Sequence, residues 1–131
     1  MAENSTLGAI APFFIVKTLA ESIDFYNRKL GFGTDLLIPQ EDPFFGIVSR
    51  DRVSIFLKEI SEEILPVPNC TRHEWARWDA FILSSDPDAL FAEFHARSLD
   101  FHETLADTSD GLRAFELKDL DGYVLCFGKP L

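Results

Sequence analysis

The sequence predicts an α+β fold in which two tandem β-α-β-β-β modules form a cleft between curved sheets. Residues 13–32 contain a short apolar run, a helix start, an amphipathic helix and a helix stop, and residues 79–101 repeat this order. Each copy is followed by segments of strand character. The repeat is longer than a solenoid repeat, so it indicates a duplicated half-domain. A cleft between paired sheets is the expected place for a ligand.

Length and composition predict one domain over residues 1–131. The chain has 131 residues, of which 47% are hydrophobic, and this is enough to bury a core. We expect module one over about residues 9–58, a linker over 59–74 and module two over about 75–128. The linker is longer than most connections within compact domains.

In the first module, residues 12–16 form the expected first strand. Thr18 and Glu21 have the spacing of a capping box, in which each side chain bonds a free amide at the helix start. Gly31 provides the helix stop. The apolar residues of the helix recur at helical spacing, which predicts a buried face: Leu19, Ile23, Tyr26 and Leu30. The strands expected next cover 35–39, 44–49 and 53–58, the last two forming a hairpin.

In the second module, the expected first strand covers residues 75–83. Asp86 is a predicted helix cap and Pro87 takes the first helical position, where its missing N–H costs nothing. Leu90, Phe91 and Phe94 are expected to face inward. The remaining expected elements are strand 99–104, loop 106–111, strand 112–118, a turn over 119–122 with Gly122 at positive φ, and strand 123–128.

Charge and sequence features argue against nucleic-acid binding, membrane association and secretion. The net charge of −10 argues against nucleic acid and disfavours anionic membrane surfaces. Glu3 and Pro12 do not suit a signal peptide, and no apolar run is long enough to span a membrane. We therefore expect a cytoplasmic protein. Cys70 and Cys126 lie in different halves of the chain and define no disulfide framework.

Three segments resemble the vicinal oxygen chelate superfamily, which includes glyoxalases, extradiol dioxygenases, fosfomycin-resistance enzymes and bleomycin-resistance proteins. They are SIDFYNRKLGF (22–32), FFGIVSRDRVSIFL (44–57) and RAFELKDLDGYVLCF (113–127). The resemblance covers essentially residues 12–128. It is specific for the fold and not for a reaction, because this superfamily hosts many chemistries.

The resemblance also indicates where a metal would be held in the metal-dependent members. The corresponding positions here are Ala11, Phe56, Asp79 and Cys126. Alanine and phenylalanine cannot ligate, and an Asp with a Cys makes a poor pair for one cation. The three histidines fall elsewhere: His73, His95 and His102. We therefore expect no metal, no other cofactor and no catalytic residue.

The residues are most similar to the bleomycin-resistance branch, whose members bind a drug without altering it. The resemblance places Pro12 on an N-terminal arm that is exchanged between the subunits of a dimer. It makes Asp35 an acidic ligand contact and Phe45 an aromatic one. Phe81 stands where that branch has a Trp on a cleft strand.

One aromatic position of that branch is missing, because Gly111 occupies it here. Trp75 and Trp78 are candidates to replace the missing ring. Each aromatic contact contributes about 1 kcal/mol, so the loss of one weakens a site for a flat ligand without abolishing it.

The sequence thus leads to a metal-independent protein that sequesters a small planar, cationic ligand in a cleft at a homodimer interface. Aromatic rings would cover its flat part and acids such as Asp35 would hold its charge. One alternative is a metal-dependent glyoxalase-like lyase or dioxygenase with Asp79 as a ligand. Another is a dimeric scaffold without a small ligand.

Overall fold

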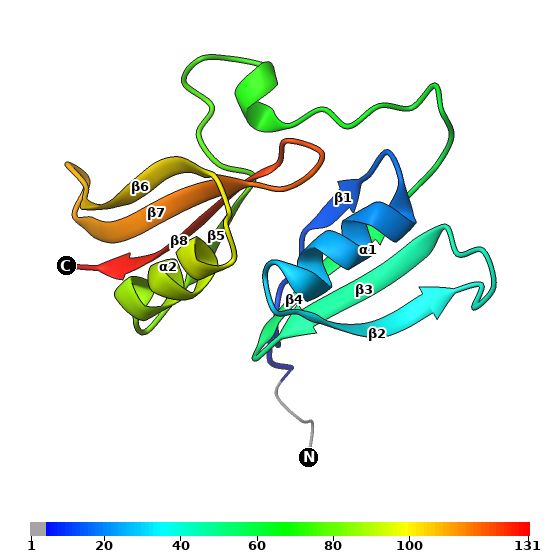
Figure 1. The fold of residues 1–131 in the computed structure, drawn as a ribbon, viewed down its shortest axis with the longest axis horizontal. Helices are drawn as coiled ribbons and strands as arrows, with labels where there is room; N and C mark the ends of the chain where they lie inside the picture. Colours follow the sequence, from blue (N-terminus) through cyan, green and yellow to red (C-terminus); the bar gives the residue numbers. More distant parts are fainter. Residues whose placement is uncertain (1–4) are drawn as a thin grey trace.

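The computed structural model describes residues 5–131 and contains two four-stranded sheets, each with one helix (Figure 1). Sheet A has the strand order β1-β4-β3-β2 and sheet B the order β5-β8-β7-β6. The first strand of each sheet is parallel to its neighbour, and the other pairs are antiparallel. The duplication predicted from the sequence is therefore confirmed in the topology.

The first module contains these elements: β1 (Phe13–Ile15), α1 (Leu19–Arg28), β2 (Gly33–Ile38), β3 (Phe45–Arg50) and β4 (Val53–Lys58). A 3-10 helix, η1 (Asn69–Thr71), interrupts the linker. The second module contains these elements: β5 (Ala80–Leu83), α2 (Pro87–Ala96), β6 (Phe101–Asp107), β7 (Leu112–Lys118) and β8 (Val124–Pro130). The bounds of β4 and β7 are those expected from the sequence.

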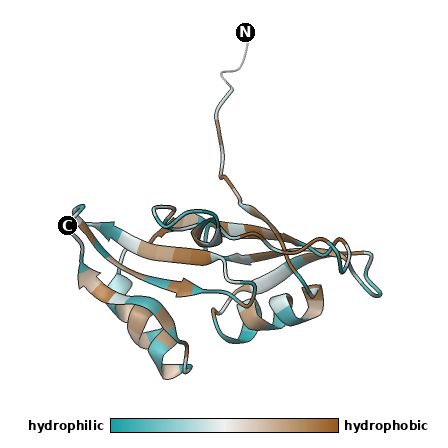
Figure 2. Ribbon diagram, turned by 90° about the horizontal axis from the view of Figure 1, so that it is seen from above, coloured by the Kyte–Doolittle hydropathy of each residue, from teal (hydrophilic) through white to brown (hydrophobic). Residues whose placement is uncertain are grey.

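Both helices lie on the same side of the two sheets (Figure 2). Each sheet therefore has an inner face toward the helices and an outer face that no helix of residues 5–131 covers. Side chains alternate between the two faces of a strand. On sheet A, Val48, Ile55 and Leu57 are buried on the inner face, so Ile47 and Phe56 point to the outer face.

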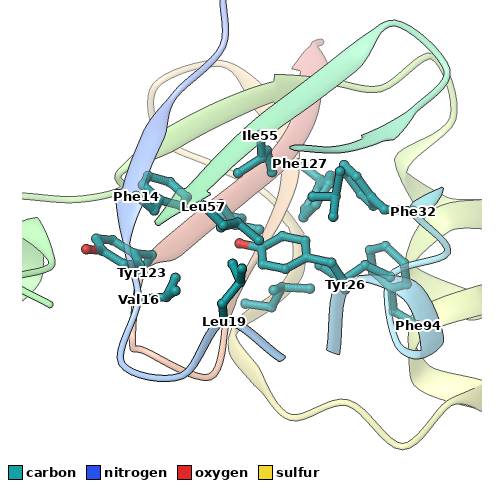
Figure 3. Close-up of a cluster of buried hydrophobic side chains, with 14 of the residues drawn as sticks. Phe14, Val16, Leu19, Tyr26, Phe32, Ile55, Leu57, Phe94, Tyr123 and Phe127 are labelled. Carbon is teal, nitrogen blue, oxygen red and sulfur yellow. The ribbon is translucent and has the colours of Figure 1, made fainter. Parts of the chain in front are cut away.

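The core lies between the inner faces and the two helices (Figure 3). Leu19, Tyr26 and Leu30 are buried, as the helical spacing predicted, and Phe94 is buried from the second helix. Leu90 and Phe91 pack against this core and are only partly buried. The core thus joins both modules on the helix side.

The two helix starts are stabilised in different ways. The Asp86 carboxylate accepts a hydrogen bond from the Ala89 amide at 3.0 Å, which confirms the predicted cap of α2. The capping box predicted for α1 is wrong, because the Thr18 side chain makes no capping bond. Instead, the Leu19 amide donates to the Glu59 carboxylate at 2.7 Å. A carboxylate from the end of sheet A thus supplies the negative charge that a helix start favours.

The strand predicted over 75–83 is also corrected, because β5 begins only at Ala80. The Asp79 carboxylate accepts hydrogen bonds from the amides of Asn69 at 2.9 Å and Val124 at 2.8 Å. These bonds tie the linker to the start of β8, so the chain before Asp79 belongs to the linker. A strand was predicted over 99–104, whereas the observed strand β6 covers Phe101–Asp107. Its pairing with β7 contains register shifts.

Two reciprocal contacts join the modules at the ends of equivalent strands. Arg50 ends β3 and forms a two-pronged ion pair with Glu93 of α2, at 2.8 and 2.9 Å. Asp119 follows β7, and its carboxylate accepts the hydroxyl proton of Tyr26 of α1 at 2.7 Å. Burial raises the pKa of Asp119 to about 7. Each module therefore reaches the helix of the other.

Among residues 5–131, no helix combines the length and apolar character that crossing a membrane requires.

Candidate functional site

The outer face of sheet A is an aromatic surface. The Phe45 ring of β3 packs against the rings of Phe13 on β1 and Phe56 on β4, with centroid distances of 6.1 and 5.7 Å. Leu36 and Ile38 on the edge strand β2 extend this surface and are exposed. An apolar area of this kind on a sheet face is typical of a binding or association surface.

Asp35, the predicted acidic contact, lies on the same edge strand. The pairing of β2 with β3 shifts between Thr34 and Leu36, and Asp35 occupies this irregularity. Its side chain is exposed to solvent. It therefore stands at the border of the sheet A surface and not among the three rings.

The outer face of sheet B is hollowed by a cavity of about 350 Å³, here called the sheet B pocket. Strands β6, β7 and β8 form its floor, and the linker before β5 forms one side. Its polar lining comes mainly from Arg77, His102, Glu103, Glu116 and Cys126. The two outer faces thus differ in chemistry, since that of sheet A is apolar and that of sheet B carries charge.

Burial shifts the pKa of two groups in the sheet B pocket. It raises the pKa of the Glu116 carboxyl, an effect opposed by electrostatic interactions with His102 and Arg77. It raises the pKa of the Cys126 thiol to about 12. A thiol with so high a pKa is protonated at neutral pH, which disfavours Cys126 as a nucleophile.

Arg77 lies at the edge of the sheet B pocket and makes three contacts. Its guanidinium is 2.6 Å from the Asp110 carboxylate and 3.8 Å from that of Glu116. Its central carbon lies 4.1 Å from the ring centroid of Trp78. The Trp78 ring in turn lies 5.6 Å from the ring of Phe81 on β5.

The structure brings together only some of the predicted site residues. Trp78 and Phe81 lie together beside the sheet B pocket, and Phe45 lies on the other sheet. Trp75 is 81% exposed, contacts the His73 ring, and does not line the pocket. Pro12 precedes β1, and its carbonyl accepts the amide proton of Phe56 at 3.0 Å.

Sequence reasoning missed two residues that line the sheet B pocket, Arg77 and Glu116, and also Asp110, which pairs with Arg77 beside the pocket. Arg77 and Asp110 are far apart in the sequence, so their ion pair left no local signal. The one available hint was an arginine flanked by aromatic residues in the segment Trp75–Trp78.

The positions at which the sequence resemblance places a metal do not fit one here. Both carboxylate oxygens of Asp79 accept backbone amide protons, and the Phe56 ring packs edge-on against Phe45. Ala11 offers no donor, and the Cys126 thiol is buried. Within residues 5–131, no group of three or more His, Cys, Asp or Glu side chains is arranged to hold an ion.

A larger cavity, of about 850 Å³, lies between the modules on the helix side. Its main charged groups, Arg50 and Glu93, are already paired with each other. The lining also includes Lys129, whose ammonium donates to the Ser85 carbonyl at 3.3 Å. The sheet B pocket lies beside the aromatic pair of Trp78 and Phe81 and carries carboxylates, so it is the better candidate for recognising a flat, charged ligand.

Comparison with known proteins gives a consistent result. A family model described as "Glyoxalase/Bleomycin resistance protein/Dioxygenase superfamily" matches residues 6–127. No protein of the curated set is similar at a significant level. Among solved structures, TioX from Micromonospora sp. ML1 is 18% identical with a TM-score of 0.71, over 97% of this chain and 100% of that one.

Two further solved structures are similar in fold. TnmS3, an antibiotic binding protein from Streptomyces sp. CB03234, is 18% identical with a TM-score of 0.69, over 98% of this chain and 100% of that one. The bleomycin-binding protein from Streptomyces verticillus, complexed with copper(II)-bleomycin, is 23% identical with a TM-score of 0.67. The match covers 95% of this chain and 97% of that one. At these identities the likeness establishes the fold alone.

Proposed function

The chain belongs to the glyoxalase/bleomycin resistance protein/dioxygenase superfamily, and we propose that it sequesters a small planar cation without the help of a metal. The binding site is a cleft at the interface of a homodimer in the cytoplasm. The observation that carries this proposal is the contrast between the two uncovered outer faces. One offers aromatic rings to a flat ligand, and the other offers carboxylates to its charge.

The exposed apolar surface of sheet A supports the dimer. Phe13, Leu36 and Ile38 are all exposed in the single chain. Closed two-fold dimers are the commonest way to cover such a surface. In our proposal, the outer face of sheet A in one copy meets the outer face of sheet B in the other, which creates two equivalent clefts. Phe45 and the Trp78–Phe81 pair, which lie on separate sheets of one chain, then line the same cleft.

The N-terminal arm supports the same arrangement. Residues 5–12 precede β1, and Leu7 and Ile10 on this arm are almost fully exposed. We propose that the arm, up to Pro12, packs on the second subunit and buries these side chains. Burial of two aliphatic side chains contributes about 3–6 kcal/mol to such a dimer, before the entropy of ordering the arm is subtracted.

The side chains at the family's metal positions support binding without a metal. The Asp79 carboxylate accepts hydrogen bonds from backbone amides of the linker and of β8. Phe56 is part of the aromatic surface. Two of the similar structures are described as binding an antibiotic or bleomycin. A drug-like, partly flat ligand is therefore a reasonable class to test first.

Tryptophan fluorescence offers a direct test, because Trp75 and Trp78 are the chain's two tryptophans. Titration with metal-free bleomycin and with a panel of planar cations should give a saturable change with one ligand per chain. The Phe45→Ala variant should bind about fivefold more weakly, since one aromatic contact is lost. Leu120→Ala, at an exposed turn residue, is the matched control and should bind normally.

Two results would contradict the proposal. One is a stoichiometric divalent ion in protein purified without chelators, together with turnover that is lost when the ion is removed. The other is a monomeric mass in light scattering combined with no response to any compound of the panel.

A further inference from the structure

We propose that Trp78, Asp110 and Glu116 form a subsite for a planar cation, and that the chain fills this subsite with its own Arg77 until a ligand displaces it. The inference rests on the proposed function and adds to it the kind of group recognised, an amidinium or guanidinium. It also makes Arg77 an internal competitor of the ligand.

The position of the Arg77 guanidinium shows what the subsite accepts. This group is flat and carries one positive charge, and it lies 4.1 Å from the Trp78 ring centroid. Cations favour this position because the face of an aromatic ring is negative. Asp110, at 2.6 Å, and Glu116, at 3.8 Å, balance its charge. Ring and carboxylates thus already hold a planar cation in the geometry a ligand would need.

Arg77 can leave this position at modest cost. It lies in the linker, outside every strand and helix, and its side chain is 49% exposed. Its ion pair with Asp110 is half-exposed on both sides, and such pairs contribute little to stability. A ligand that brings its own cation keeps the carboxylates paired, so the exchange leaves no buried charge without a partner.

The subsite adjoins space that a ligand can fill. Arg77 lines the sheet B pocket of about 350 Å³, whereas Trp78 does not. The guanidinium therefore stands between the pocket and the ring. Its departure would open the pocket to the Trp78 face and add a stacking surface next to Glu116.

Charge favours a cation once Arg77 has moved. Glu103 on β6 and Glu116 on β7 lie opposite each other in the strand register, and both line the sheet B pocket. His102 is the other basic group there, facing these carboxylates with Arg77. Without the Arg77 guanidinium, the carboxylates of Glu103 and Glu116 outnumber the one remaining base, His102. This excess of acidic groups favours the binding of a cation.

Arg77→Met tests the proposal, because it removes the charge and keeps most of the apolar stem. The probe is benzamidine, a planar cation, and benzamide is the neutral molecule of similar shape. Calorimetric titration should show benzamidine binding about fivefold tighter to Arg77→Met than to the original chain, because neither the cation–π contact nor the ion pair has to be broken. Benzamide should show no such gain.

Arg113→Met is the matched control. Arg113 lies on the opposite face of β7 and pairs with Asp88 and Asp107. Its replacement changes net charge by the same amount, so benzamidine affinity should stay within about twofold. In the Arg77→Met background, Glu116→Gln and Trp78→Leu should each remove the gain. Arg77→Gln serves as a second variant, and thermal unfolding confirms that each variant is folded.

Unchanged or weaker benzamidine binding in both folded Arg77 variants would overturn the inference, as would an equal gain for benzamide or for Arg113→Met. These outcomes are distinct from failure of the proposed function. If the original chain binds a flat cationic drug and the Arg77 variants show no gain, only the internal competitor is disproved. If the Arg77 variants gain affinity and the chain is a monomer without response to the panel, only the proposed function fails.

Discussion

The two modules share one scaffold and differ at equivalent positions on its surface. In sheet A, Phe56 is paired with Phe13 on one side and Ile47 on the other. In sheet B, the same register places Cys126 between Phe81 and Glu116. The first row is wholly apolar, whereas the second contains a thiol and an acid.

The buried centres of the inner faces show no such divergence. Ile55 of β4 and Leu125 of β8 occupy equivalent positions, each next to the row just described, and both are fully buried. The comparison indicates that packing against the helices restricts one face of each sheet and leaves the other free to acquire different chemistry. Four predictions test this difference, from the largest expected effect on stability to the smallest.

Truncation of the equivalent inner residues should destabilise the protein to a similar extent. Ile55→Ala and Leu125→Ala should each lower the free energy of unfolding by about 3 kcal/mol, since each leaves a cavity in one shared core. Urea denaturation measures both. Ile47→Ala on the outer face is the control, with an expected loss of about 1 kcal/mol. A difference of more than about 2 kcal/mol between the inner variants would contradict a shared core.

Asp119 should make the stability depend on pH. Its pKa is raised from 3.8 to about 7 by burial, so folding favours the protonated carboxyl. The stability it contributes is full below about pH 4 and is lost as the pH rises through 7, by about 2–4 kcal/mol in total. Asp119→Asn removes the titrating group. Urea denaturation at pH 5 and pH 8 should therefore show a smaller loss in the variant than in the original chain, and equal losses would disprove this role.

The equivalent contact in the other module should respond to pH with the opposite sign. The hydrogen bonds from Arg50 hold the pKa of Glu93 below its usual value. Its contribution is present at neutral pH and is lost as the pH falls below about 4. Glu93→Gln should cost about 1 kcal/mol at pH 7 and progressively less as the pH falls toward 3. A cost that persists at pH 3 would mean that packing, and not charge, is responsible.

The smallest effect on stability is expected at Glu116, where Glu116→Ile makes the row of sheet B resemble that of sheet A. The change removes a carboxylate that is costly to bury and leaves Arg77 paired with Asp110. The free energy of unfolding should change by less than about 1 kcal/mol, and benzamidine affinity should fall. A loss of 2 kcal/mol or more in urea denaturation would show that Glu116 is mainly structural.

Much of the fold could be predicted because its signals are local. The spacing of apolar residues identified α1, and the strands β4 and β7 were predicted with their observed bounds. Asp86 before Pro87 identified the start of α2. These features depend on residues close in the sequence, where capping and periodicity are physically determined.

Three of the errors involve partners far away in the chain. The capping box at Thr18 failed because Glu59 supplies the bond to the Leu19 amide. The strand before Asp79 was extended too far because this carboxylate binds the linker and β8. The ion pair between Arg77 and Asp110 was invisible for the same reason. Tertiary contacts override local preference at these places.

The reciprocal contacts of Arg50 and Asp119 have an evolutionary consequence. Ile47 and Glu116 occupy equivalent positions in the two sheets. Arg50 is the third residue after Ile47, and Asp119 is the third residue after Glu116. In a half-length ancestor, two identical chains would have met with the same residue at both junctions, so one substitution altered both at once. In a single chain, each junction can change without the other. The ion pair at one junction and the acid–phenol bond at the other fit such separate change.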